Sequence, residues 1–518
     1  MLTPGYLKTC GDDLVRLYQQ LEDDIVRDAA RRIVKMDFSV TDAARWQIER
    51  LQQSGAVYED MIKSLSKYTG KSEREIKKLL QSSSVQSLVY DDAIYKKAGL
   101  LPPPLSGSPL LMQHITAAVS KTSNSFKNLT MTTAVKSQAD FINACDRAYM
   151  QVSSGTLDYV TAVKWAVKSV SDTGASVLYP SGRSDKLDVA VRRAVLTGVS
   201  QTGNELQILR MDEMGCTLVE TTAHFGARPT HTVWQGRVYS RNGDTSKYPD
   251  FIASTGYGSG DGLGGWNCRH GFFPFFEGFS QRAYTDGQLR DRENRTVTYD
   301  GQTYTDYEAS QIQRKFERDI RAKKRELVGF DTAANASADA RVINAAKAEF
   351  ASASVKLKDK ESKLADFLHQ TGRDIDTVRQ QVQGFGRSQA QKAVWANKKE
   401  IDIRRMDDII KNNSHLPKKA KLPDEKIKQT VDVALPLIQG VVPKNANATN
   451  VYVMAGKSTS TRIKDIRRLS NTYGGRPANW QKKSADVYGE NFKYVVHWYE
   501  NNGIAPEQEF KIKGVKKL

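Results

Sequence analysis

Apolar residues recur at helical spacing over most of this 518-residue chain, and the pattern stops between residues 216 and 278. Leu14, Leu21 and Ile25 belong to one such stripe near the N-terminus. Between 216 and 278, glycines, prolines, aromatics and short β-rich pieces replace the periodicity. We therefore expect an α+β multidomain protein that is predominantly helical, with a loop- and β-rich central domain.

The first hundred residues predict a row of short amphipathic helices. Thr41 or Asp42 can cap one of them, and Ser72 with Glu75 forms a capping-box pair that would begin another. The proline-rich run 101–107 cannot be helical and predicts a linker. Helical spacing resumes after it at residues 159–170 and again after Asp185, around residues 191–196.

Two hairpins of different kinds are expected after the central segment. Residues 296–304 read as a β-hairpin with an Asp300-Gly301 turn. The charged stretch that follows predicts a helical hairpin, broken between residues 329 and 339. Its second helix carries heptad-spaced apolar residues, namely Ile343, Phe350, Leu357 and Leu364, with Ala346, Ala353 and Phe367 at the other seam positions.

The C-terminal part predicts a small α+β domain after a polar linker at residues 412–423. Residues 450–455 have β character and a basic helix follows at 461–470. A strand at 492–500 would pair with residues 509–513 across Asn501-Asn502-Gly503. The length favours three or four domains, and we place the segment boundaries at 1–105, 106–210, 211–304, 305–411 and 424–518.

The charge balance points to acidic partners. The formal net charge is +18 and the sequence pI about 9.4, which favours DNA, RNA, acidic proteins or anionic lipid, although a basic solvated surface would look the same. The four cysteines, Cys10, Cys145, Cys216 and Cys268, are scattered and give no disulfide framework. We expect no secretory signal and no membrane-spanning segment.

Common catalytic signatures are missing from the sequence. It holds no P-loop, no dinucleotide-binding fingerprint and no Gly-x-Ser-x-Gly elbow. The glycine-rich run 256–265 has no following Lys-Ser/Thr and no strand–helix frame. We therefore predict a flexible loop there and no phosphate cradle.

Two sets of residues are candidate sites. The first is the possible metal set Cys216, His224, His231, Cys268 and His270, because thiolate and imidazole are the usual zinc ligands. Its spacing matches no zinc-knuckle pattern, so buried histidines bonded to loop carbonyls are the alternative. We expect no cofactor, with a structural zinc ion as the open second interpretation.

The second set, near the C-terminus, has the residue types of a metal-independent ribonuclease: a general base, a general acid and cations for the phosphorane. A packed strand histidine is the simpler interpretation, because His497 stands between Val496 and Trp498. The candidate ribonuclease residues are Lys457, Arg462, His497 and Glu500.

Two coupled motifs resemble a known family. The run from Thr221 to Tyr239 and the run from Gly262 to Pro274, which contains a Trp-Asn-Cys-Arg element, are similar to phage minor capsid proteins related to the Mu F-like head morphogenesis family. The resemblance extends over about the first 280 residues. The motif residues are Arg228, Pro229, His231, Gly236, Trp266, Asn267, Cys268, Arg269 and His270.

The resemblance implies a structural virion protein and no enzyme. It implies a place at the portal vertex of a tailed bacteriophage capsid, a role in head assembly and in DNA packaging or ejection, and synthesis in the host cytoplasm. The partners implied are the portal protein, the major capsid or scaffolding protein and double-stranded DNA bound without sequence preference, and no membrane.

Two other functions stay open. The C-terminal segment, through residues 467–475, 479–483 and 497–500, distantly resembles barnase/RelE-like RNase toxins. The protein would then be a virion-carried effector that cleaves RNA. The other alternative is a general nucleic-acid-binding protein, which the net charge alone would support.

Overall fold

The computed structural model describes residues 1–398, 417–422, 447–501 and 505–518. These residues form two compact units. We call residues 1–342 with 356–389 the body, and residues 343–355 with 390–518 the C-terminal unit. Helices dominate and small sheets accompany them, which confirms the predominantly helical α+β class.

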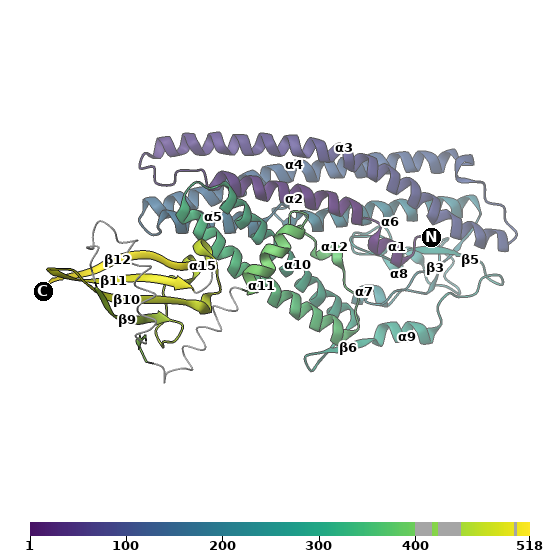
Figure 1. The fold of residues 1–518 in the computed structure, drawn as a ribbon. Helices are drawn as coiled ribbons and strands as arrows, with labels where there is room; N and C mark the ends of the chain where they lie inside the picture. The colour runs from purple at the N-terminus through teal and green to yellow at the C-terminus, as the bar shows by residue number, and fades with distance from the viewer. Residues whose placement is uncertain (399–416, 423–446, 502–504) are drawn as a thin grey trace. The chain divides into compact units, whose positions relative to one another are not determined.

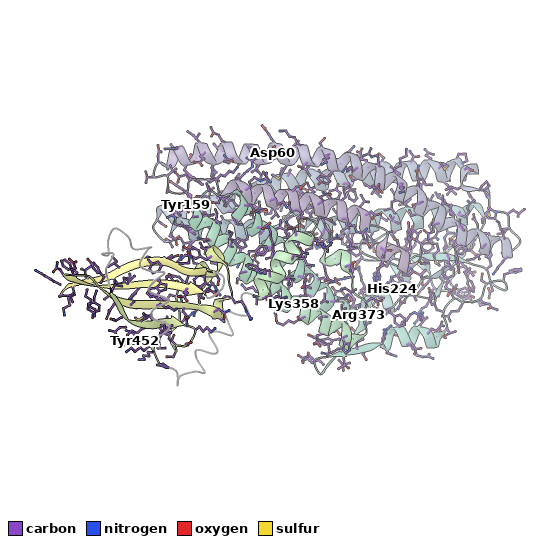
Figure 2. The ribbon with its side chains drawn as sticks, in the orientation of Figure 1. Asp60, Tyr159, His224, Lys358, Arg373 and Tyr452 are labelled. Carbon is purple, nitrogen blue, oxygen red and sulfur yellow. The ribbon has the colours of Figure 1, made fainter. Side chains whose placement is uncertain are left out.

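The body is built on helices that pack along one another (Figure 1). They are α2 (Asp12–Ile33), α3 (Ala43–Lys97), α4 (Pro109–Ser153), α5 (Tyr159–Thr173) and α6 (Leu187–Glu213). Polar side chains join them as well as apolar ones. Arg32 of α2, for example, reaches the carboxylate of Asp60 on α3 at 2.5 Å, and Asp60 is labelled in Figure 2.

The expected row of short helices is wrong, because α3 alone runs for 55 residues. Asp42 caps it as predicted, but Ser72 lies inside it. The Ser72 hydroxyl donates to the carbonyl of Thr69 and accepts from Tyr18 on α2. Buried serines interrupt the apolar stripe of α3 and so hide its continuity in the sequence. The 101–107 linker is confirmed, with one 3-10 turn η1 (Leu105–Gly107) before α4.

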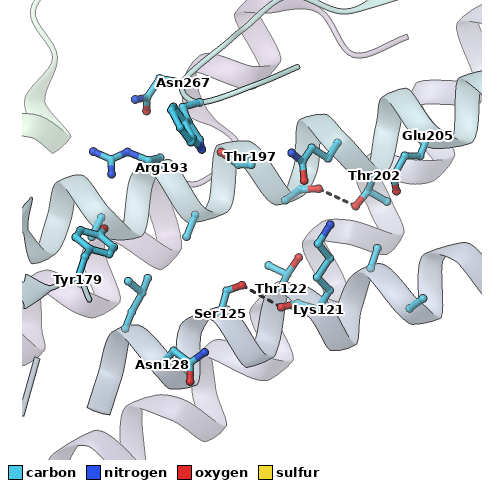
Figure 3. Close-up of a pocket in the computed structure, with 18 of the residues that line it drawn as sticks. Lys121, Thr122, Ser125, Asn128, Tyr179, Arg193, Thr197, Thr202, Glu205 and Asn267 are labelled. Atoms are coloured by element: carbon cyan, nitrogen blue, oxygen red, sulfur yellow. Dashed lines mark hydrogen bonds between the residues drawn. The ribbon is translucent and has the colours of Figure 1, made fainter. Parts of the chain in front are cut away.

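A cavity of about 1060 Å³ lies between α4 and α6 (Figure 3). Its wall includes Lys121 from α4, Arg193 and Glu205 from α6, and Arg183 from the β1–β2 hairpin (Ser176–Leu178 and Ser184–Lys186). Arg183 and Arg193 both pair with Asp185, at 3.3 and 2.8 Å. Part of the basic wall is therefore neutralised by the protein itself.

The central segment forms a three-stranded antiparallel sheet with β3 in the middle. The strands are β3 (Leu218–Thr221), β4 (Val238–Ser240) and β5 (Phe272–Phe275), with the short helices α7 (Pro229–Thr232) and α8 (Phe251–Thr255) in the connections. Its buried aromatics share one core with Tyr95 of α3 and Met211 of α6. The central segment thus packs into the body and does not stand apart from it.

The predicted β-hairpin is confirmed as β6 (Thr296–Tyr299) and β7 (Gln302–Thr305), following α9 (Asp286–Asn294). Both turn residues have positive φ, 49° at Asp300 and 74° at Gly301, as a two-residue turn of this type requires. The chain then enters α10 (Asp306–Ala336), whose first turn is fixed by a capping box between Thr305 and Glu308.

The predicted helical hairpin is also confirmed, as α10 and α11 (Ala340–Thr371), before the short α12 (Thr377–Gln380). The break is shorter than expected, because Gly329 lies inside α10. A Cβ on Gly329 would come within 2.0 Å of the Ser171 hydroxyl on α5, so this glycine permits close helix packing and does not end the helix.

Buried charges tie four helices of the body together. Glu22 of α2 pairs with Arg321 and Arg325 of α10, and Arg321 also pairs with Asp188 of α6. The Arg325 guanidinium donates to the carbonyls of Ser171 and Asp172 at the end of α5. These side chains lie far apart in sequence, which is why spacing rules alone do not reveal the network.

The C-terminal unit contains a five-stranded antiparallel sheet in the order β12-β11-β10-β9-β8. Its parts are β8 (Ala420–Lys421), β9 (Asn447–Gly456), α15 (Ile466–Tyr473), η2 (Pro477–Asn479), β10 (Trp480–Tyr488), β11 (Phe492–Asn501) and β12 (Ala505–Lys517). The predicted strands and helix are confirmed, with the helix starting later than expected. Residues 412–416, 423 and 502–503 of the predicted linker and turn lie outside the described residues.

The predicted boundaries at residues 105, 210 and 304 all fall inside the body. The boundaries at 105 and 210 separate α3, α4, α6 and the central sheet, which bury apolar side chains against one another in two clusters. The remaining short element of the body is α1 (Pro4–Thr9). Within the described residues, no helix combines the length and the apolar composition that a membrane crossing requires.

Candidate functional site

The two motif runs meet at the central sheet. The first run begins at the last residue of β3, contains α7 and ends in β4. The second run ends in β5, which pairs with β3 from the other side. Pro229 begins α7 directly after Arg228, and His231 sits in that helix. The Arg228 guanidinium donates to the carbonyl of Trp266 at 2.6 Å and so joins the two runs.

The glycine-rich loop is closely packed. Leu263 donates to the carbonyl of Thr255, and Trp266 to that of Gly260, at 3.0 and 2.7 Å. A Cβ on Gly262 would lie 2.0 Å from the Gly256 carbonyl oxygen, so only glycine fits there. The loop prediction is confirmed, but this packing indicates a defined turn where a flexible segment was expected. The backbone N–H of Cys268 donates to the carbonyl of Gly265, the last residue of the loop, at 3.1 Å.

Three potential ligand atoms converge inside this arrangement. The Sγ of Cys268 lies 3.7 Å from the Nδ1 of His231 and 3.5 Å from the Nδ1 of His270. The two Nδ1 atoms are 3.4 Å apart. All three residues are buried, with 2% or less of each exposed. Among the described residues, these three have ligand atoms close enough together to hold a metal ion.

The far nitrogens of both imidazoles are bonded to oxygens. The Nε2 of His231 is 2.8 Å from the carbonyl oxygen of Asp261, and the Nε2 of His270 is 3.1 Å from Oε1 of Gln235. That same Gln235 oxygen accepts the backbone N–H of His224 at 3.1 Å. Each ring is therefore held from behind, with its Nδ1 turned toward Cys268.

His224 supports this cluster from one side. Its ring stacks on that of His270 with centroids 4.3 Å apart and planes inclined by 26°. Its Nδ1 lies 2.8 Å from the carbonyl oxygen of Phe225. Burial lowers the pKa of His224 to about 4, and the charge of Arg269 adds to the effect. His224 thus packs as a neutral ring beside the three converging atoms.

Burial also keeps the three converging groups neutral in the bare protein. It lowers the pKa of His270 well below its usual value, with further contributions from His224 and His231. It lowers the pKa of His231 and raises the pKa of the Cys268 thiol. Hydrogen bonds from the backbone of Gly264 and His270 oppose the shift at Cys268, because they favour the thiolate.

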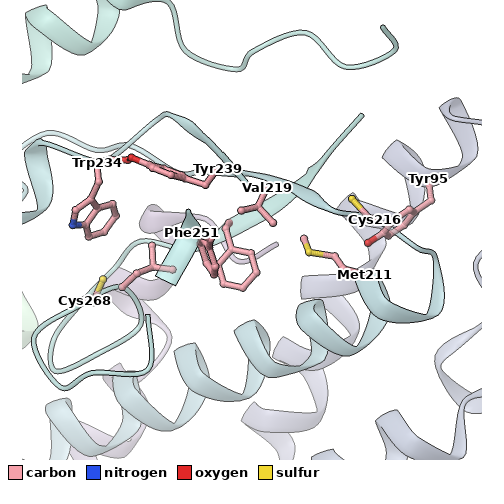
Figure 4. Close-up of a cluster of buried hydrophobic side chains, with 10 residues drawn as sticks. Tyr95, Met211, Cys216, Val219, Trp234, Tyr239, Phe251 and Cys268 are labelled. Atoms are coloured by element: carbon pink, nitrogen blue, oxygen red, sulfur yellow. The ribbon is translucent and has the colours of Figure 1, made fainter. Parts of the chain in front are cut away.

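Cys216 does not join this group. Its Sγ lies 3.3 Å from the carbonyl oxygen of Leu218 and 3.9 Å from that of Phe275. Figure 4 shows Cys216 and Cys268 at opposite ends of the central core. Cys216 was grouped with the others by residue type alone, and β3, which starts just after it, carries the chain away from it toward the histidines.

The other motif residues shape the backbone around the cluster. Asn267 has a φ of 55°, which turns the chain into Cys268. Gly236 has a φ of 67°, and a Cβ there would lie 2.5 Å from Leu289. Trp266 is 61% exposed, and burial lowers the pKa of Arg269. Gln235, which the sequence analysis missed, stands directly before Gly236 in the first run.

The C-terminal candidates are not brought to one point. His497 lies opposite Ser484, and Glu500 opposite Gln481, in a regular pairing of β10 with β11. Residues three apart on a strand project from opposite faces. Glu500 contacts Lys483 at 2.8 Å and Trp498 at 3.4 Å on its own face. The two groups that acid–base catalysis needs therefore lie on opposite sides of the sheet.

The two candidate cations lie beyond the end of β9. The backbone N–H of Lys457 donates to the carbonyl of Trp480, at the start of β10, and Arg462 follows in the same loop. His497 lies next to Ser484, four residues further along β10. Burial lowers the pKa of His497, and Lys482, Lys513 and Lys419 lower it further. These lysines are neighbours that the sequence analysis did not identify.

Comparison with known proteins bears on the body. The family model for phage minor capsid protein 2 matches residues 2–369. The chain belongs to this family. A structural protein of Lactococcus phage LL-H is 24% identical over 334 residues, which cover 60% of this chain and 85% of that protein. No solved structure matches the chain.

The resemblance to phage minor capsid proteins is thereby confirmed. The protein is a structural component of a bacteriophage particle and a contact partner of other virion proteins. This membership fits a structural role without catalysis. The match includes the motif runs around His231 and Cys268 and ends at residue 369, before the C-terminal sheet.

Proposed function

We propose that this minor capsid protein lies at the portal vertex, where the body contacts the portal and neighbouring shell proteins and the C-terminal sheet contacts packaged DNA. The observation that carries the proposal is the family match, which covers most of the body and ends before the sheet. A role in head assembly and in DNA packaging or ejection follows from such a place.

The outer faces of the long helices suit protein contacts. Several large apolar side chains on α3 and α4 are exposed even though the helices are packed on their inner faces. Apolar surface of this kind gains free energy when a neighbouring protein covers it. The exposed residues on these two helices are Ile48, Leu51, Val85, Val89, Tyr90, Leu110, Met112, Met131, Val135 and Met150.

The C-terminal sheet suits a polyanion. Residues 447–518 hold 13 Lys or Arg against 6 Asp or Glu, so this short segment contributes a large part of the net charge of +18. Lys511 lies directly opposite His497 on β12, and Lys513 follows two residues later. Both lysine side chains are exposed. Phosphates neutralised by such lysines release counterions, and the binding is insensitive to base sequence.

Cross-linking of purified phage particles, followed by mass spectrometry, tests the position. We expect cross-links from body lysines to the portal protein, and a few copies of this chain per particle. Cross-links confined to tail proteins would contradict the proposal. Heads that assemble and package DNA normally without this protein would also contradict it.

Charge reversal tests the DNA contact. The double variant Lys511→Glu with Lys513→Glu should bind random duplex DNA more weakly, and the slope of its salt dependence should fall by about one for each phosphate that is no longer neutralised. The matched control is Lys356→Glu with Lys358→Glu on α11 of the body (Figure 2), which changes the net charge equally. Equally weakened binding in the two variants would remove the sheet as the DNA-binding surface.

A further inference from the structure

We propose that Cys268, His231 and His270 bind one structural Zn²⁺ ion through Sγ and the two Nδ1 atoms. The site lies where the two motif runs meet, between α7 and the end of the glycine-rich loop. It is independent of the portal and DNA contacts proposed above. Three observations support the proposal: the spacing of the three atoms, the imidazole tautomers that hydrogen bonds select, and the burial of the three side chains.

The spacing of the three atoms is that of a zinc tetrahedron. Zinc binds sulfur at about 2.3 Å and imidazole nitrogen at about 2.0–2.1 Å, so tetrahedral angles place sulfur about 3.6 Å from nitrogen and two nitrogens about 3.3 Å apart. The observed S–N distances are 3.5 and 3.7 Å, and the N–N distance is 3.4 Å. All three edges agree with the expected values.

The hydrogen bonds behind the rings decide which nitrogen carries the proton. The Asp261 carbonyl can only accept, so the Nε2 of His231 is protonated. The Gln235 atom next to His270 accepts a backbone N–H from His224, so it is the oxygen, and the Nε2 of His270 is protonated as well. Both neutral rings therefore turn an unprotonated Nδ1 toward Cys268.

Without a metal this arrangement lacks donors. Two lone pairs face each other at 3.4 Å, and the Cys268 thiol has one proton to give to them. A buried acceptor that is left without a donor destabilises the folded chain. Zinc binding removes the problem, because the ion accepts a lone pair from each of the three atoms while the thiol proton leaves to solvent.

The surroundings match a metal site in a structural role. The two carbonyl-type oxygens behind the imidazoles are the usual outer partners of zinc-bound histidines, and they fix the ring orientation. The backbone N–H of His270 donates to the Cys268 sulfur at 3.4 Å, which favours the thiolate. Burial of all three ligands leaves no open face for a substrate. A water molecule would take the fourth position of the tetrahedron, because the described residues bring only these three ligand atoms together.

Elemental analysis and cobalt substitution of the full chain test the site. We expect one zinc per chain after purification. After a chelator has removed the zinc, added Co²⁺ should produce the visible bands of tetrahedral cobalt and a near-ultraviolet sulfur-to-cobalt charge-transfer band. Zinc-free folded protein whose cobalt spectrum lacks that sulfur band would overturn the proposal, and so would copper in place of zinc. This spectrum is read on the unmodified chain and needs no variant to fold.

Variants then assign the ligands. Cys268→Ser should abolish the sulfur-to-cobalt band, whereas Cys216→Ser, which alters a buried cysteine of the same core, should retain it. Gln235→Ala leaves the ligands in place and should weaken zinc binding about 10–100-fold, as removal of an outer partner does. A sulfur band that survives Cys268→Ser and disappears in Cys216→Ser would overturn the assignment.

Discussion

The central segment and the C-terminal sheet each hold a set of candidate site residues that includes histidine, yet only the central segment brings such residues to one point. His231 and His270 are 39 residues apart in sequence, and their Nδ1 atoms are 3.4 Å apart in space. His497 and Glu500 are close in sequence and project from opposite faces of a strand. Hydrogen-bonded loops can join distant side chains, whereas strand alternation separates near ones.

The ion pairs of the two units differ in how exposed they are. In the body, Glu22 and Arg321 are 1% and 3% exposed and lie between packed helices. In the C-terminal unit, Arg468 and Glu509 are 38% and 17% exposed at the surface of the sheet. When one partner of a buried pair is lost, water cannot take its place beside the remaining charge. Mutations of ion pairs should therefore affect the two units unequally.

The largest difference is expected between Arg321→Met and Arg468→Met. Loss of Arg321 leaves Glu22 and Asp188 short of a buried cation, which should reduce the free energy of unfolding by about 3–5 kcal/mol. Loss of Arg468 breaks a solvent-screened pair and should cost about 1 kcal/mol or less. Urea denaturation of the two full-length variants measures both values. Similar shifts in the two transitions would break the comparison between the units.

The next effect is a pH dependence of body stability through Asp23. Burial is the main cause that raises the pKa of the Asp23 carboxyl from 3.8 to about 7. The folded state then binds this proton more tightly than the unfolded state does. The stabilisation from Asp23 is therefore complete below pH 4 and is lost as pH rises through 7. Asp23→Asn removes this titration. The change in the free energy of unfolding across that pH window should therefore be smaller by a few kcal/mol.

The Asp23 measurement is a series of urea midpoints between pH 4 and pH 8. Asparagine can still accept the backbone N–H of Gly384 that Asp23 accepts now. Asp13→Asn, at an exposed carboxylate on the same helix, is the matched control and should follow the unmodified protein. An Asp23→Asn curve as steep as that of the unmodified chain would remove Asp23 as the cause.

A smaller effect is expected when Gln235 is replaced by alanine. Its oxygen accepts from the buried imidazole of His270 and from the part-buried backbone N–H of His224. Its loss leaves the buried His270 donor unsatisfied, which should reduce the free energy of unfolding by about 1–3 kcal/mol. Gln302→Ala, at an exposed position of the β-hairpin, should stay within about 0.5 kcal/mol. Differential scanning calorimetry of both variants compares them. Equal melting temperatures would show that the cluster does not depend on Gln235.

Sequence alone predicts the elements whose signals are local. The Asp300-Gly301 turn, the Asp42 cap and the α10–α11 hairpin are all confirmed, because each depends on neighbouring residues. The length of α3 was missed, since buried serines stand in its apolar stripe. The ties between α2, α6 and α10 through Glu22 and Arg321 were also missed, because pairing of distant charges leaves no periodic pattern.

The candidate site, like the fold, could be predicted from the sequence only in part. The motif runs identified the segments that hold His231, Cys268 and His270, but residue type could not exclude Cys216. Gln235 and the Asp261 carbonyl escaped notice because their role appears only when the loop closes on α7. In the sheet, by contrast, the period of two along a strand is enough to separate His497 from Glu500, because both residues fall within one predicted strand.

The smallest expected effect is that of His497→Ala on RNA cleavage. A metal-independent ribonuclease needs its acid and base on one face of the protein, so that both reach the same bound substrate. Glu500 lies on the other face and pairs with Lys483, and the Nδ1 of His497 is buried without a hydrogen-bond partner in the described part of the chain. We expect the full-length protein and the variant to show the same background cleavage with EDTA present. Cleavage that exceeds background and falls at least about tenfold in His497→Ala, while Lys358→Ala at an exposed position of the body retains it, would establish the effector function. It would also show that the sheet, like the central segment, assembles its polar residues into a site.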